Sequence, residues 1–240
     1  MQSIGLGEDR LGKKRRRKRQ RQLDTAVATI QRRFGPQALV KGKPARVTSG
    51  TAAVPHIPTG FPALDRALGT GGLPKGKVCE LVGPATSGKT TLALKFLAQA
   101  QAGGGQVAYV DQALYFDPDY AHRCGVDLSH LLVGTTHDLQ EALAMTEALA
   151  RSGGLAALVF DALEFLWTDP VAASLLAATL NRLPAALART GMVLLVLHEL
   201  PTGGSPTGGS PALSTLAHTA TVRLQVVRER WLRRHGDVRG

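Results

Sequence analysis

A glycine-rich segment with one lysine carries the clearest chemical signature in this 240-residue sequence. Residues 83–90 read GPATSGKT and follow the pattern G-x-x-x-x-G-K-[ST]. Such glycines let backbone N–H groups turn toward a phosphate, the lysine neutralises β- and γ-oxygens, and the last hydroxyl can ligate Mg²⁺. The residues expected to hold a nucleotide are Gly83, Pro84, Ala85, Thr86, Ser87, Gly88, Lys89, Thr90 and Thr91.

An acidic residue after an apolar run is the candidate for holding Mg²⁺ at that site. Residues 158–161 read LVFD, and a strand that ends in an acid near a phosphate loop typically holds Mg²⁺. We therefore expect Thr90 and Asp161 to act on the metal, although a lone aspartate after a strand can also cap a helix. A group that activates water is expected after the strand at 107–110, where Asp111 is followed by Gln112 and Ala113.

Strand-like and helical segments alternate on both sides of these residues. Short apolar runs predict strands, and longer apolar or amphipathic runs predict helices. Apolar strands joined by helices predict an α/β fold, with a mostly parallel central sheet and helices on both faces. The expected strands are 78–82, 107–110, 131–133, 155–160, 192–197 and 221–227, and the expected helices are 90–102, 118–124, 139–151 and 171–189.

The net charge of +11 is concentrated at the two ends of the chain. Residues 13–21 contain eight basic residues and no acidic one, and the last eighteen residues contain six arginines against two acids. This distribution favours nucleic acid as a partner over a merely solvated tail or an anionic membrane surface. The candidate nucleic-acid contacts are Lys13, Lys14, Arg15, Arg16, Arg17, Lys18, Arg19 and Arg21.

Composition divides the chain into four parts. Leu23, Val27, Ile30 and Phe34 recur at helical spacing and predict an amphipathic helix, which a Gly- and Pro-rich stretch separates from the rest. The expected parts are a disordered basic tail at 1–22, an amphipathic helix and linker at 23–58, the nucleotide-binding core at 59–230 and a basic end at 231–240.

Cysteine content and hydropathy exclude several classes of protein. Cys79 and Cys124 have no metal-binding or disulfide-scaffold spacing, which suits a reducing cytoplasm. No apolar run approaches the ~20 residues of a membrane span, and no secretory signal follows the basic block. We therefore expect a cytoplasmic protein with no membrane partner.

These motifs together resemble those of the bacterial RecA recombinases. The resemblance covers about residues 23–230 and implies a RecA-type P-loop ATPase core that uses ATP and Mg²⁺. It further implies filaments on single-stranded DNA and a role in recombination and repair. The segments that carry it are GGLPKG at 71–76, ELVGP at 80–84, SGKTT at 87–91, DPDYA at 117–121, GVD at 125–127 and TGG at 207–209.

Several residues match family positions of known role. Asp117 and Tyr120 match positions that contact adenine, with Tyr120 stacking on the base. The loop at 200–213 matches the second DNA-binding loop, and the helix at 23–34 matches the element that docks on a neighbouring subunit. The resemblance therefore implies self-association, or entry into a RecA filament, through that helix. It also adds Thr207, Gly208 and Gly209 to the DNA candidates.

The sequence departs from the family where hydrolysis is concerned. The family's catalytic glutamate falls on Ala113, and the Asn-Gln pair that senses the γ-phosphate falls on His198-Glu199. Asp111 and Glu80 remain possible substitutes for the missing base. The residues expected to take part in catalysis are Lys89, Asp161 and Glu199.

Two functions fit these observations. The first is a RecA-like ATP-binding protein that binds single-stranded DNA in homologous recombination or DNA repair, with weakened ATP hydrolysis. The alternative is a non-hydrolysing RecA paralogue that uses ATP as a structural switch and modulates a recombinase filament or a repair polymerase.

Overall fold

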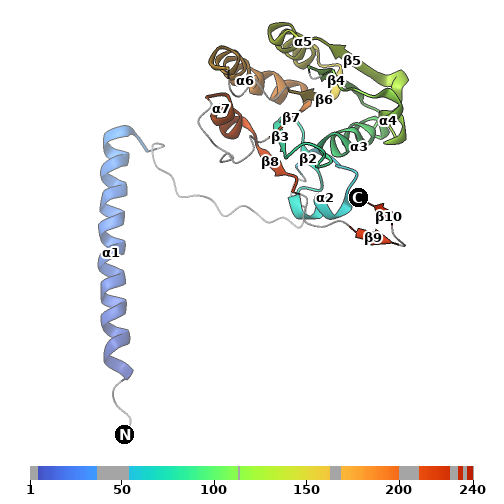
Figure 1. The fold of residues 1–240 in the computed structure, drawn as a ribbon. Helices are drawn as coiled ribbons and strands as arrows, with labels where there is room; N and C mark the ends of the chain where they lie inside the picture. The colour runs from blue at the N-terminus through green and yellow to red at the C-terminus, as the bar shows by residue number, and fades with distance from the viewer. Residues whose placement is uncertain are drawn as a thin grey trace. The chain divides into compact units, whose positions relative to one another are not determined.

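Two compact units make up the chain, residues 1–52 and 53–240. The structure is a computed structural model that describes residues 5–36, 54–112, 114–162, 169–199, 211–227, 232–234 and 237–239. In the first unit it describes one helix, and in the second a sheet with its covering helices (Figure 1).

Helix α1 (Gly5–Phe34) forms the described part of the first unit. We expected residues 1–22 to be a disordered tail, whereas the structure describes residues 5–22 as the first part of this helix. Lysine, arginine and glutamine have good helix propensities, and residues 5–22 contain no proline or β-branched residue to interrupt the helix. The expected helix at 23–34 is therefore the last part of a longer one.

The core of the second unit is a six-stranded sheet in which every neighbouring pair of strands is parallel. Its strand order confirms the expected α/β class with a parallel central sheet. From one edge to the other the strands are β5 (Leu131–Thr135), β4 (Gln106–Asp111), β6 (Leu155–Asp161), β7 (Val193–His198), β3 (Val78–Val82) and β8 (Val222–Gln225).

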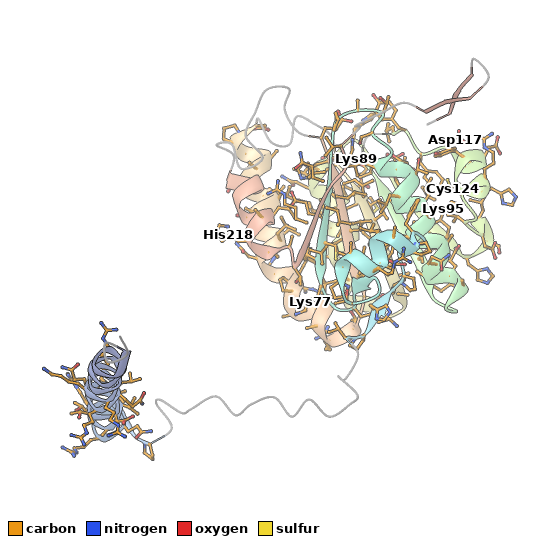
Figure 2. All side chains as sticks on the ribbon, turned by 90° about the horizontal axis from the view of Figure 1, so that it is seen from below. Lys77, Lys89, Lys95, Asp117, Cys124 and His218 are labelled. Carbon is orange, nitrogen blue, oxygen red and sulfur yellow. The ribbon has the colours of Figure 1, made fainter. Side chains whose placement is uncertain are left out.

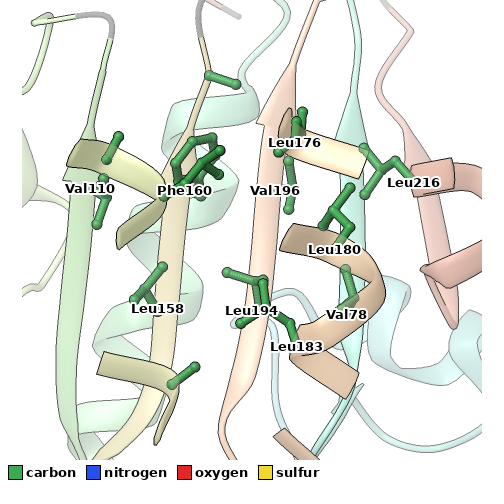
Figure 3. Packing of buried hydrophobic residues seen from close by; sticks show 14 of the residues in the cluster. Val78, Val110, Leu158, Phe160, Leu176, Leu180, Leu183, Leu194, Val196 and Leu216 are labelled. Carbon is green, nitrogen blue, oxygen red and sulfur yellow. The ribbon is translucent and has the colours of Figure 1, made fainter. Parts of the chain in front are cut away.

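Helices cover both faces of this sheet. On one face, Leu176, Leu180 and Leu183 of one helix pack against Leu194 and Val196 of the sheet (Figure 3). On the other face, Leu94, Phe96 and Leu97 pack against strand residues such as Leu81 and Val159. The first face is covered by α5 (Leu139–Ser152), α6 (Pro170–Thr190) and α7 (Pro211–Thr219), and the second by α3 (Lys89–Ala102) and α4 (Pro118–Arg123).

Helix α6 is long and apolar enough to cross a membrane when length and composition alone are considered. However, 44% of its apolar window is buried inside the second unit. Leu176, Leu180 and Leu183 are almost completely buried against the sheet. The packing of a core helix therefore accounts for its composition.

Short elements that the sequence analysis did not anticipate complete the second unit. Strand β1 (His56–Ile57) lies in the segment expected to be linker and pairs with β2 (Leu73–Pro74). Part of the loop expected at 200–213 belongs to α7, which begins at Pro211. The remaining elements are α2 (Pro62–Leu68), the 3₁₀ turn η1 (Leu128–His130) and a hairpin of β9 (Leu232–Arg234) and β10 (Asp237–Arg239).

Candidate phosphate-binding site

The carboxyl ends of four neighbouring strands meet at one edge of the sheet. Asp111 at the end of β4 is paired in register with Asp161 at the end of β6. Val82 at the end of β3 is paired with His198 at the end of β7. Ligands of open α/β sheets bind at this edge. The parallel register therefore brings the predicted phosphate loop and the predicted metal-side acid to the same side of the molecule.

The loop from Gly83 to Gly88 joins β3 to α3 in the strand–loop–helix arrangement that phosphate binding requires. A side chain at Gly83 would place its Cβ 2.6 Å from the carbonyl oxygen of Val226 and 2.8 Å from Ser87 Oγ. Gly88 has a φ of +98° and precedes the first helical residue, Lys89 (Figure 2). Glycine is needed at Gly83 for space and at Gly88 for backbone conformation.

A cavity of about 560 Å³ opens between this loop and the ends of β6 and β7. The loop, the start of α3 and the metal-side candidate Asp161 all line it. Seven of the nine residues predicted for the nucleotide line it, from Ala85 to Thr91. The other lining residues are Tyr115, Asp161, Ala162, His198 and Glu199.

Lys89 is buried in the wall of the cavity, with 8% of its surface exposed. Its Nζ donates to the carbonyl oxygens of Gly83 and Pro84, both at 2.8 Å. It also donates to Glu199 Oε1 at 3.2 Å, forming an ion pair between two residues that line the cavity. The predicted phosphate-binding lysine and the predicted Glu199 therefore lie together, and they contact each other.

Asp161 lines the same cavity and is held by a tyrosine that the sequence analysis missed. The hydroxyl of Tyr109 donates to Asp161 Oδ2 at 2.5 Å. Burial raises the pKa of Asp161 to about 6, and the charges of Asp111 and Glu199 add to this effect. The Tyr109 hydrogen bond and the charge of Lys89 oppose it. Burial and the neighbouring Asp161 charge raise the pKa of Tyr109 well above its ordinary value, so the tyrosine remains a donor.

The residues present suit a hydrated divalent cation that binds together with a nucleotide. The Thr90 hydroxyl and the Asp161 carboxylate both line the cavity, and both are the oxygen donors that Mg²⁺ prefers. Within the described residues no group of three or more His, Cys, Asp or Glu side chains is placed to hold a metal. This fits a cation held by one carboxylate, one hydroxyl and phosphate oxygens.

The residues predicted to contact adenine lie at the start of α4, and one of them contacts a residue that lines the cavity. Asp117 caps this helix by accepting a hydrogen bond from the backbone N–H of Tyr120 at 3.0 Å (Figure 2). The Tyr120 hydroxyl lies 2.6 Å from Thr91 Oγ1, which lines the cavity, and the Arg123 guanidinium lies 5.7 Å from the centre of the Tyr120 ring. Their contact with adenine stays a prediction.

The two acids considered as substitute bases are engaged elsewhere. The Asp111 carboxylate accepts backbone hydrogen bonds from Tyr115 and Phe116, at 3.3 and 2.8 Å. Glu80 is fully buried, with Oε1 2.7 Å from His198 Nε2 and Oε2 3.1 Å from Arg223 Nε. Asp111 thus makes contacts within the fold at the end of β4, and Glu80 does so from the middle of β3. Ala113, where the family has its catalytic glutamate, lies outside the described residues.

Three neighbours of the site carried no signal in the sequence. Tyr109 sits inside an apolar strand, where an aromatic residue is ordinary, and Arg223 was counted only with the basic C-terminal residues. Tyr115 is 82% exposed and lines the cavity. Only the pairing of β4 with β6 and of β3 with β8 reveals what Tyr109 and Arg223 contact.

The predicted DNA contacts fall into two groups. Arg17, Lys18, Arg19 and Arg21 are exposed on α1, and the backbone of residues 13–16 belongs to the same helix. The three residues predicted from the second DNA-binding loop lie outside the described residues: Thr207, Gly208 and Gly209.

The family described as the RecA N-terminal domain matches residues 21–238. The chain belongs to the RecA family. Its relatives include Protein RecA of Chlorobaculum tepidum, 39% identical over 197 residues, which are 76% of this chain and 55% of that protein. Protein RecA of Streptomyces coelicolor is 44% identical over 149 residues, 62% of this chain and 38% of the relative.

A third RecA protein, from Brucella anthropi, is 37% identical over 191 residues, 74% of this chain and 52% of the relative. The chain therefore spans about half, or less, of the length of these RecA proteins. Family membership confirms the expected resemblance, and the parallel sheet agrees with the expected core fold.

Proposed function

We propose that this RecA-family chain binds ATP and Mg²⁺ in the cavity between its phosphate loop and the ends of β6 and β7. The observation that carries the proposal is the placement of Lys89, which starts α3 directly after the glycine-rich loop and reaches into a cavity that Asp161 also lines. Backbone N–H groups of the loop and the Lys89 ammonium would hold the phosphates, and Thr90 and Asp161 would hold the cation. Bound Mg²⁺ neutralises charge on the β- and γ-phosphates.

We further propose that hydrolysis is weak. The family's catalytic carboxylate is replaced by Ala113, and a general base of this kind typically contributes ~10²–10⁴ in rate. Asp111 and Glu80 make contacts within the fold and neither lines the cavity, which argues against either as a replacement. Lys89 is also ion-paired with Glu199, and this contact weakens the electrostatic stabilisation that Lys89 can offer to a phosphate during transfer.

For the cellular role we propose single-stranded DNA binding in recombination or repair. The support is RecA-family membership and the exposed basic side chains of α1. Leu23, Ile30 and Phe34 are exposed on the same helix, which supports self-association or docking on a RecA filament. The Lys89–Glu199 pair and Ala113 favour the second candidate, a non-hydrolysing paralogue that modulates such a filament or a repair polymerase. A cytoplasmic location remains an expectation.

Single-turnover hydrolysis, measured with and without single-stranded DNA, tests the weak-hydrolysis proposal. We expect wild-type turnover far below about one per second, the low end of ordinary enzymes. Ala113→Glu should raise it by about tenfold or more, because it restores a carboxylate that can activate water. Ala144→Glu, on an exposed position of α5, adds the same charge elsewhere and should change nothing. Wild-type turnover well above one per second would contradict the proposal.

A further inference from the structure

The Lys89 ammonium has no donor left over for a phosphate in this structure. A lysine side chain carries three N–H donors. Lys89 directs them to two loop carbonyl oxygens and to the Glu199 carboxylate, at 2.8, 2.8 and 3.2 Å. A nucleotide that uses Lys89 must therefore replace at least one of these acceptors, and Glu199 is the only charged one among them.

Glu199 is held at this place by the end of β7. His198 is fully buried, with Nε2 2.7 Å from Glu80 Oε1 and Nδ1 3.2 Å from the carbonyl oxygen of Glu199. The register of β7 with β3 sets His198 beside Val82, the last residue before the loop. The backbone of Glu199 is thus fixed next to Gly83, and its side chain lines the cavity.

The position and the charge of Glu199 bear on how many phosphates the site can hold. The backbone N–H groups of a phosphate loop cradle the α- and β-phosphates, whereas its lysine reaches the β- and γ-oxygens. A third phosphate would therefore compete with the Glu199 carboxylate for Lys89 and be repelled by it. A nucleoside diphosphate can bind to the N–H groups of the loop without placing a negatively charged phosphate beyond Lys89. Repulsion against one ligand is a recognised source of specificity.

We infer that Glu199 is a specificity-determining residue that lowers the affinity of the site for nucleoside triphosphates more than for nucleoside diphosphates. The inference rests on the proposed nucleotide binding and deepens it. The Glu199 side chain is 33% exposed, so it has room to turn toward solvent when a triphosphate enters. The effect is therefore a shift in the ratio of two affinities and not a complete block.

Equilibrium titration with Mg²⁺ and either ADP or a non-hydrolysable ATP analogue tests this inference on the full chain. Glu199→Gln keeps the size of the side chain but can donate to a phosphate, whereas Glu199→Ala removes the charge without adding a donor. Both variants should gain about tenfold or more in triphosphate affinity and less than about threefold in diphosphate affinity.

Glu147→Gln is the matched control. This glutamate is also ion-paired and partly buried, with Oε1 3.1 Å from Arg151 Nη2 and 3.0 Å from Arg182 Nε on the covering helices. Glu147→Gln should leave the affinities for the diphosphate and the triphosphate unchanged. This result would separate the local effect of the Glu199 substitutions from the effect of a change in net charge.

The possible results separate this inference from the proposed function. Equal gains for both nucleotides, no gain in either variant, or a gain in Glu199→Gln alone would overturn the inference while leaving nucleotide binding in place. Failure of the wild type and every variant to bind either nucleotide would overturn the proposed function, and this inference with it.

Discussion

Charged side chains are used differently in the cavity and on helix α1. Around the cavity, Lys89 is buried and contacts two loop carbonyls and Glu199, and Asp161 is held by the Tyr109 hydroxyl. On α1, the basic residues from Arg17 to Arg21 are exposed to solvent along one helix. The first group depends on a fixed geometry, whereas the second offers mainly a density of positive charge.

This difference predicts two kinds of response to substitution. A buried ionised group depends on its particular partners, so removing one changes binding or stability strongly. Exposed charges interact through a high dielectric and are screened by salt, so each contributes a small and nearly equal share. Substitutions at the cavity should therefore have large, position-specific effects, and those on α1 should have small, additive and salt-dependent ones.

The largest effect is expected for Lys89→Ala. We expect triphosphate affinity to fall by about 10² or more, because a cation facing the β- and γ-oxygens is lost from a partly desolvated site. Equilibrium titration measures the change. Lys95→Ala, on the same helix (Figure 2), is the control and should bind as the wild type does. Equal affinities for Lys89→Ala and the wild type would contradict the phosphate-loop assignment.

A smaller effect is expected for Asp161→Asn, on stability. The folded-state pKa of Asp161 is raised from 3.8 to about 6, so the folded protein binds a proton more tightly than the unfolded chain. Ionised Asp161 therefore destabilises the fold increasingly as the pH rises from about 4 to about 6. Near pH 7 and without Mg²⁺, the variant should gain on the order of 1–3 kcal/mol in free energy of unfolding.

Denaturant unfolding of wild type and Asp161→Asn between pH 4 and pH 8 checks this expectation. The advantage of the variant should shrink as the pH falls from about 6 toward 4, because Asp161 of the folded wild type becomes protonated, and it should vanish below about 3.8, where Asp161 is protonated in both states. A difference that does not vary with pH would show that Asp161 titrates normally in the folded protein.

The smallest effect per residue is expected on α1. Deleting residues 1–21 removes all eight basic residues of the run at 13–21. Each phosphate contact contributes ~0.7 to the slope of log K against log salt for single-stranded DNA. If about half of these residues contact phosphates, the deletion should make that slope shallower by about 3 units. Lys89→Ala should leave this slope unchanged. An unchanged slope after the deletion would contradict a DNA role for the basic run.

Helix α1 shows that composition alone can wrongly indicate disorder. Dense positive charge indicated disorder for residues 1–22, whereas the structure has one helix from Gly5 to Phe34. The same residue types that repel one another are also good helix formers, and composition alone does not weigh these two tendencies. In the core the expected strands and helices agree with the structure to within a few residues, because apolar periodicity reports directly on burial.

Three features could be recognised without the structure, because each depends on spacing between near neighbours: the phosphate loop, the strand that ends in Asp161 and the replacement of a family carboxylate by Ala113. Which charged groups contact one another became clear from the folded chain alone. Lys89 and Glu199 are 110 residues apart, and Tyr109 and Asp161 are 52 apart. These pairs meet because the strand order places β7 beside β3 and β4 beside β6, and that order is set by packing across the whole sheet.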